Sequence, residues 1–158
     1  MANRRAFYEQ ADHALLSSSR LSLLIIDLDG FKAVNDTYGH QEGDHFLTHL
    51  GGLLEASTRD VGLASRVGGD EFYIYLVDLT ESEVLAFIHE LQMTLNRNPY
   101  RTPDVTIPIR ASIGVSHALD QGTDLDTLIH KADQAMYQIK QDGKNDYAIY
   151  DEALHGPK

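Results

Sequence analysis

The stretch Gly68-Gly69-Asp70-Glu71-Phe72 interrupts two apolar segments, 63–67 and 72–77, with two glycines and two carboxylates. Apolar runs on both sides of a glycine-containing break predict a β-hairpin. Glycines at its turn reach positive φ at little steric cost and let the backbone approach a ligand closely. Acids there would be exposed at a sheet end, where Mg²⁺ and its phosphates can be held. Taken alone, the stretch fits a solvated hairpin tip equally well.

Length and composition limit the class of protein. The chain has 158 residues and no cysteine, so we expect one domain, 1–158, with neither disulfides nor thiolate metal sites. Its longest strongly apolar run, 21–26, is too short to cross a bilayer and no signal peptide is visible, which predicts a cytoplasmic domain. A net charge of −11 argues against binding a nucleic-acid duplex. A small polyphosphate remains compatible with that charge when metal ions bridge the like charges.

The start of the chain enters a helical pattern at Phe7 with no lead-in. We therefore interpret the sequence as the C-terminal piece of a longer signalling protein. Such a protein could be anchored to a membrane through its amino-terminal region.

Hydrophobic periodicity predicts helices and short strands around the hairpin. Residues 21–28 form a continuous apolar run ending in acids, typical of a strand buried on both faces. Helical spacing recurs over 46–54, 84–95 and 125–139, and Thr80 to Glu83 reads as a capping box. Between the last two helices we expect a pair of strands, since the segment 105–116 alternates as a strand, with Pro108 at an edge or bulge. Residues 147–150 close the chain as a strand. This order predicts an α/β sandwich, a mixed sheet with helices packed on it.

Acidic residues lie at the end of the predicted strand 21–28. Asp27 and Asp29 share one face of it because side chains alternate, and they lie at its carboxyl end, where open α/β sheets usually bind ligands. If the hairpin pairs beside this strand, Asp27 and Asp70 converge. Two neighbouring carboxylates repel unless a cation or proton lies between them. We favour a divalent metal bound by both; as a single residue, Asp27 would be a strand-end cap.

The segment 30–36 leads from that strand into a loop or helix, and free amides at such a junction form a phosphate cradle. Asn35, His40 and Asp44 are spaced over the following turns. An acid that accepts hydrogen bonds from N1–H and the N2 amine of guanine would discriminate against adenine. On propensity alone, Asn35 and Asp44 would equally well cap the helix over 46–54.

Lys140 and Lys144 lie on either side of Gly143, which is expected to end the last helix at a C′ position. They either complement the helix dipole or neutralise a triphosphate. His45 and His49 stand four residues apart, a spacing that can bind metal, but no third ligand is evident and we favour a solvated or packed pair.

Taken together, these residues resemble the GGDEF domains, diguanylate cyclases that condense two GTP into cyclic di-GMP. The resemblance runs almost end to end over five ordered blocks: 3–7, 27–40, 68–72, 111–115, and 132–137 followed by 143–145. It implies a fold like the palm of nucleotide polymerases and adenylyl cyclases, with a ferredoxin-like core and a central, largely antiparallel sheet flanked by helices.

The resemblance also implies roles for individual residues. It assigns two Mg²⁺ or Mn²⁺ ions per half-site to Asp27, the Leu28 carbonyl, Asp70 and Glu71. Asp70 and Glu71 are the implied catalytic residues, with Asp70 as the base for the ribose 3′-hydroxyl. The implied nucleotide contacts are Asn35 and Asp44 at the base with His40 nearby, and Gly69 as a further substrate contact. At the phosphates they are the Phe31 and Lys32 backbone amides, Lys140 and Lys144.

Each half-site in this family holds one GTP, so the resemblance implies that two domains must face one another, at least transiently, as a homodimer. The amino-terminal region is then the expected dimerising or sensing module. The alternative is a catalytically inactive GGDEF module that binds GTP or cyclic di-GMP as a sensor. The presence of all the motif acids favours the enzyme.

One departure from the family concerns regulation. Many members carry an Arg-x-x-Asp product-inhibition site before the hairpin, whereas this chain has Arg59-Asp60-Val61-Gly62. Without the aspartate we expect a degenerate site with weak product inhibition, and we expect Gly62→Asp to strengthen it. The alternative is that Arg59 and Asp60 are an ordinary solvated loop pair.

Overall fold

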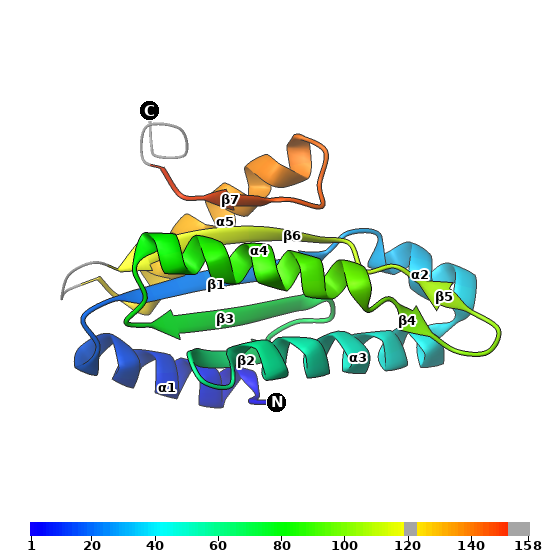
Figure 1. Cartoon of the computed structure of the whole chain (residues 1–158), viewed down its shortest axis with the longest axis horizontal. Coiled ribbons are helices and arrows are strands. Elements are labelled where there is room, and N and C mark those ends of the chain that lie inside the picture. The colour runs from blue at the N-terminus through cyan, green and yellow to red at the C-terminus, as the bar shows by residue number, and fades with distance from the viewer. Residues whose placement is uncertain (119–122, 152–158) are drawn as a thin grey trace.

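The computed structural model describes residues 1–118 and 123–151. Five strands form its main sheet in the order β2-β3-β1-β6-β7 (Figure 1). Their bounds are β1 Leu21–Leu28, β2 Gly62–Arg66, β3 Glu71–Val77, β6 Ala111–Ala118 and β7 Tyr147–Ile149. All neighbours pair antiparallel except β6 and β7, which pair parallel. The predicted mixed, largely antiparallel sheet is confirmed, as is the hairpin β2-β3.

Helices cover both faces of this sheet, in layers that Figure 1 shows with α4 in front and α5 behind. Hydrophobic clusters place α1 Arg4–Ser17 and α5 Leu125–Gln141 on one face, and α3 His40–Thr58 and α4 Glu81–Arg97 on the other. The short helix α2 Phe31–Tyr38 follows β1 directly. Among the described residues, no helix has the length and apolar character needed to cross a membrane.

Strand β1 lies in the middle of the sheet and is buried on both faces, as its apolar run predicts. Leu23 and Ile25 belong to the core under α1 and α5, whereas Leu24 and Ile26 belong to the core under α3 and α4. A fully buried Leu or Ile contributes ~1.5–3 kcal/mol to stability. The strand is therefore held firmly, and its carboxyl end is a rigid base for polar residues.

The alternation predicted over 105–116 is interrupted, at the edge or bulge expected near Pro108. The structure divides it into β5 Thr106–Ile107, which pairs with β4 Tyr100–Arg101 in a separate small sheet, and β6, which begins at Ala111. Pro108 lies in the break, because a proline has no N–H to donate to a ladder. The small sheet is tied to α3 by the Tyr100 hydroxyl, which donates to Glu42 Oε2 at 2.8 Å.

The expected helix ends are present. Thr80 and Glu83 form the predicted capping box at the start of α4. Gly143 follows α5 with φ +120°, and the Lys144 N–H donates to the Ile139 carbonyl at 2.9 Å. This left-handed turn directs the chain from α5 into β7 and back past the end of β1.

Candidate active site

The site lies where the carboxyl end of β1 meets the turn of the β2-β3 hairpin. Asp27 on β1 lies opposite Glu71 on β3, and the Leu28 N–H donates to the Asp70 carbonyl at 3.2 Å. The pKa of Asp27 is raised, first because the carboxyl is partly buried and also because Asp70 repels its charge, although Lys140 opposes the shift. Asp70 therefore lies beside the end of β1, near enough to Asp27 for their charges to interact.

The Leu28 carbonyl joins the same edge of the site. The Asp29 N–H donates to Arg110 on the β6 side at 2.8 Å. Because a trans peptide directs its C=O opposite to its N–H, the Leu28 oxygen points to the other side, toward Asp70. Two carboxylates and a carbonyl are hard oxygen ligands, the type that Mg²⁺ prefers.

The arrangement of acids fits a cation that is shared with substrate. Within the part of the chain that the structure describes, no three His, Cys, Asp or Glu side chains are gathered closely enough to hold a metal by themselves. Mg²⁺ commonly takes only one or two protein carboxylates and fills the rest of its shell with waters and phosphate oxygens. The donors at Asp27, Leu28 and Asp70 are of that kind.

Glu71 lies on the α5 face of the sheet. Its pKa is raised, first by burial and then by repulsion from Asp133 on α5. Because Glu71 faces Asp27 across the β1-β3 pair, their side chains lie on the same side of the sheet. Glu71 thus adds negative charge next to Asp27.

The hairpin turn is held by a residue that the sequence analysis missed. Arg66 donates from Nε to the carbonyls of Gly68 and Gly69, both at 3.1 Å, and from Nη2 to Gly69 at 2.8 Å. The expectation of positive φ at this turn is wrong, since neither Gly68 nor Gly69 is among the positive-φ glycines. Gly69 instead leaves open space at the turn, because it is exposed and a Cβ there would meet no atom within 4 Å.

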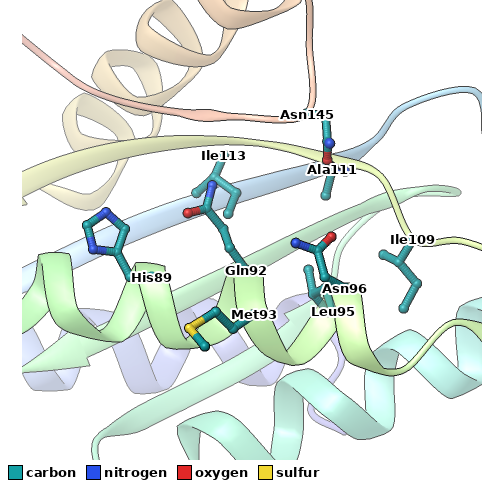
Figure 2. Close-up of a pocket in the computed structure, with 9 residues that line it drawn as sticks. All are labelled: His89, Gln92, Met93, Leu95, Asn96, Ile109, Ala111, Ile113 and Asn145. Atoms are coloured by element: carbon teal, nitrogen blue, oxygen red, sulfur yellow. Dashed lines mark hydrogen bonds between the residues drawn. The ribbon is translucent and has the colours of Figure 1, made fainter.

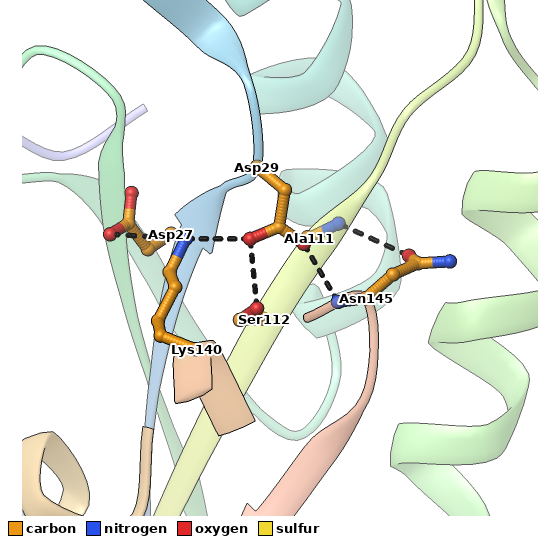
Figure 3. Close-up of polar contacts among 6 residues, drawn as sticks. All are labelled: Asp27, Asp29, Ala111, Ser112, Lys140 and Asn145. Atoms are coloured by element: carbon orange, nitrogen blue, oxygen red, sulfur yellow. Dashed lines mark hydrogen bonds and ion pairs between the residues drawn. The ribbon is translucent and has the colours of Figure 1, made fainter. Parts of the chain in front are cut away.

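Asp29 and Lys140 form the polar centre next to Asp27 (Figure 3). Lys140 Nζ lies 2.6 Å from Asp29 Oδ1 and 3.5 Å from Asp27 Oδ2. Asp29 also accepts from Ser112 Oγ and from the Asn145 N–H, both at 2.8 Å. Lys140 is therefore ion-paired with the two acids at the end of β1, an interaction that neither of the two expected roles described.

A possible phosphate cradle follows β1. Gly30 precedes α2 in the left-handed region, with φ +76°, and no side chain caps the helix. The first-turn amides, including those of Phe31 and Lys32, therefore have no intrahelical acceptor and can bind an anion. The Phe31 ring stacks on Phe46 of α3 with centroids 6.3 Å apart, which fixes α2 on the domain.

Asn35, His40 and Asp44 lie where α2 meets α3. The capping alternative is wrong for Asn35 and Asp44, because α3 begins after Gly39 without a side-chain cap and Asp44 lies inside the helix. A Cβ at Gly43 would overlap the Asn35 side chain, so Asn35 lies against α3 at Gly43, the residue before Asp44. His40 is exposed at the first residue of α3.

Lys144 lies beyond α5, exposed, with φ +66°. It is not in the last turn of the helix, so only Lys140 holds that position. Of the two histidines considered for metal binding, His49 contacts the Asn98 carbonyl at 2.7 Å, and His45 lies 4.0 Å from Glu42. Their separate partners agree with the packed or solvated interpretation.

Arg59 lies at the opposite end of β2 from the hairpin turn, away from the acids. It lines a groove of about 540 Å³ between α1 and β2, together with His13, Asp60 and Gly62. The expectation for Gly62→Asp is opposed by the structure, because a Cβ at Gly62 would overlap the Tyr75 carbonyl on β3. An aspartate at this position would have to displace the paired strand.

Two further hollows adjoin the polar centre. One, of about 680 Å³, runs along α5 beside Asp27 and includes Asp133, Tyr137 and Lys140. The other, of about 420 Å³, lies between α4 and β6 (Figure 2). Its lining includes His89 and Gln92 from α4 and Asn145 from the loop after α5.

Residues 1–146 match the model of the family described as diguanylate cyclase, GGDEF domain, and the chain belongs to this family. It is 39% identical to the biofilm architecture maintenance protein MbaA of Vibrio cholerae over 98% of this chain and 21% of MbaA. It is 32% identical to the response regulator PleD of Caulobacter vibrioides over 90% of this chain and 33% of PleD. The chain thus spans about a fifth to a third of these relatives' length.

Solved GGDEF domains share the fold. The domain of DgcB from Caulobacter crescentus, in complex with c-di-GMP, has a TM-score of 0.86 at 25% identity, covering 95% of this chain and 91% of that one. The domain of PA1120 from Pseudomonas aeruginosa has a TM-score of 0.88 at 28% identity, with coverage of 96% and 97%. These similarities agree with the palm-like fold that the sequence motifs imply.

Proposed function

We propose that this domain is an active diguanylate cyclase, which condenses two GTP into cyclic di-GMP and two pyrophosphates. The observation that carries the proposal is that Asp27 lies opposite Glu71 at the end of β1 and that both interact with the charge of Asp70 on the hairpin. A module that only binds nucleotide needs contacts for the base and phosphates, but it has no need of acids at the reacting end. Solved relatives that hold c-di-GMP agree with the product.

The substrate contacts follow from the placement of the polar residues. Asn35 and Asp44 would bind the guanine edge, with His40 beside the nucleotide. The α2 amides of Phe31 and Lys32, the exposed backbone at Gly69, and the two lysines would bind the phosphates: Lys140 next to Asp27, and Lys144 on the loop after α5. A chain of net charge −11 needs such local positive groups, as well as cations, to hold a triphosphate.

Asp27, Asp70 and the Leu28 carbonyl would hold Mg²⁺ or Mn²⁺, two ions per half-site, with Glu71 in support. When bound, such ions lower the pKa of the attacking hydroxyl and neutralise the leaving group. Asp70 would accept the proton of the 3′-hydroxyl. The O3′–Pα bond then forms while the bond from Pα to the bridging oxygen breaks, and pyrophosphate leaves with its charge held by Lys140 and Lys144.

Each half-site would hold one GTP, so two domains must face one another for both bonds to form. We propose that residues 1–158 are a single catalytic domain of a longer signalling protein. Its remaining region would bring two such domains together or keep them apart, because catalysis requires two facing domains.

The test is to incubate the domain with GTP and Mg²⁺ at several protein concentrations and to separate the nucleotides by chromatography. We expect cyclic di-GMP, formed at a rate per domain that rises with concentration because two domains must meet. Tight GTP binding without product at any concentration would favour the sensor alternative.

A further inference from the structure

We propose that Asp29 is a positioning residue that prepares Lys140 and the loop 143–145 for the triphosphate. Asp29 would act on the substrate only through these two elements. The inference rests on the proposed function, since it assumes that Lys140 and Lys144 bind phosphate.

Asp29 is placed to hold other groups and not to bind a ligand itself. Its side chain is only 7% exposed. Oδ1 accepts from Ser112 Oγ and Lys140 Nζ, and Oδ2 accepts from the Asn145 N–H. Both oxygens are thus engaged by donors from β6, the end of α5 and the following loop (Figure 3). A carboxylate so fully bonded has little capacity left for a metal or a nucleotide.

Lys140 is the first group that Asp29 controls. A lysine ammonium has three donors on a flexible stem, and holding it in one place costs side-chain entropy. The bond to Asp29 uses one donor and fixes the ammonium 3.5 Å from Asp27, at the reacting end of the site. Without Asp29, the nearest remaining acid is Asp27. Lys140 would then either move freely or pair with a carboxylate that the cation needs.

The loop after α5 is the second group. Lys144 and Asn145 both have positive φ, +66° and +50°, a region that non-glycine residues rarely adopt. Two bonds hold Asn145 there: its N–H donates to Asp29, and its Oδ1 accepts from the Ala111 N–H at 3.3 Å. Removing the carboxylate takes away one of the two bonds. Lys144, which precedes Asn145, would lose its fixed direction.

The experiment is a double-mutant cycle on ligand binding. The probe is Mg²⁺ with 3′-deoxy-GTP, which lacks the attacking hydroxyl and cannot be condensed; GMP, which lacks the β- and γ-phosphates, is the comparison. The variants are Asp29→Asn, Lys140→Gln and the double variant. Asp142→Asn is the matched control, because it removes an exposed charge two residues after Lys140 that forms no ion pair with the lysine in the structure.

We expect Asp29→Asn to weaken 3′-deoxy-GTP binding about tenfold, the usual effect of losing a charge-assisted hydrogen bond, while GMP affinity stays within about twofold. Lys140→Gln should lose a similar factor, and the double variant should lose less than the product of the two single effects, because the part of the Asp29 effect that passes through Lys140 is already lost in Lys140→Gln. Asp142→Asn should match the wild type.

The proposal is overturned if Asp29→Asn binds the triphosphate like the wild type, if GMP affinity falls equally, or if the two losses multiply. Should Asp29→Asn fail to fold, Ser112→Ala removes one bond to Asp29 and should give a smaller loss confined to the triphosphate; no loss overturns the proposal. A wild type that binds no 3′-deoxy-GTP refutes the proposed function as well. A wild type that makes cyclic di-GMP while the cycle fails refutes only the role of Asp29.

Discussion

Gly43→Ala tests the guanine site without removing any polar group. Gly43 lies in the second turn of α3, and a Cβ there would overlap Asn35 Oδ1 and approach Phe31 at 3.4 Å. The Asn35 side chain is flexible and can turn aside, so the fold should survive. We therefore expect the substitution to move Asn35 away from the base while leaving the helices in place.

Gly43→Ala should affect stability and nucleotide affinity differently. Alanine in place of glycine favours a helix by ~1 kcal/mol, which offsets the cost of turning Asn35. Losing one hydrogen bond to the base costs ~0.5–1.5 kcal/mol, so affinity for the guanine nucleotide should fall about two- to tenfold. Gly52→Ala is the matched control, because Gly52 lies in the same helix with no atom within 4 Å of its Cβ position. It should raise Tm by about 2–4 °C and leave affinity unchanged.

Calorimetric titration of Mg²⁺ with 3′-deoxy-GTP and 3′-deoxy-ATP, together with thermal unfolding, measures both effects. Gly43→Ala should reduce the preference for guanine over adenine, and Gly52→Ala should not. The reasoning is refuted if Gly43→Ala keeps the full wild-type preference, because an alanine at position 43 leaves no room for the Asn35 side chain in the orientation that the structure shows.

Other predictions concern chemistry, pH and regulation. Asp70→Asn should reduce the initial rate of cyclic di-GMP formation by orders of magnitude with Tm nearly unchanged, since it removes a charge used in the transition state; near-normal turnover would contradict that role. Burial lowers the pKa of His117, so the folded state takes up its proton less readily than the unfolded state. Stability should therefore fall as pH drops from about 7 to 5, and in urea unfolding His117→Gln should lose less over that range; equal losses would contradict this. Arg59 has no aspartate three residues later, so low-micromolar cyclic di-GMP should barely change initial rates, and strong inhibition abolished by Arg59→Ala would contradict this. Gly62→Asp should lower Tm, because its Cβ would overlap the Tyr75 carbonyl, and an unchanged Tm would show that β3 moves easily.

Local sequence pattern was sufficient for the elements that frame the site. The apolar run 21–28 indicates a buried strand, and the glycine break at 68–69 indicates a turn, from the residues of each segment alone. The structure has β1, β2 and β3 where these patterns predict them. The alternating pattern over 105–116 did not predict where the strands end, because the pattern continues across Pro108, whereas the ladder of backbone hydrogen bonds is interrupted there. The capping interpretation of Asn35 and Asp44 failed because α3 begins at His40, before the apolar spacing that indicated the helix.

The contacts of Asp29 at the centre of the site could not be predicted from local sequence patterns. Asp29 meets Ser112, Lys140 and Asn145, which lie 83 to 116 residues away in sequence. These contacts exist only because β6 pairs with β1 and α5 returns its end to that edge. The clamp of Arg66 on the turn glycines was also missed, although a basic residue two positions before the glycine pair was a readable signal.

The most direct measurement of the central claim is the stoichiometry of the reaction. The domain is incubated with Mg²⁺ and GTP labelled at the α-phosphate, and cyclic dinucleotide and pyrophosphate are quantified together over time. An active cyclase converts two GTP into one cyclic di-GMP and two pyrophosphates, with the label entirely in the dinucleotide. Recovery of the label as unchanged GTP, under conditions where calorimetry shows the nucleotide bound, would contradict the claim and leave a nucleotide-binding module.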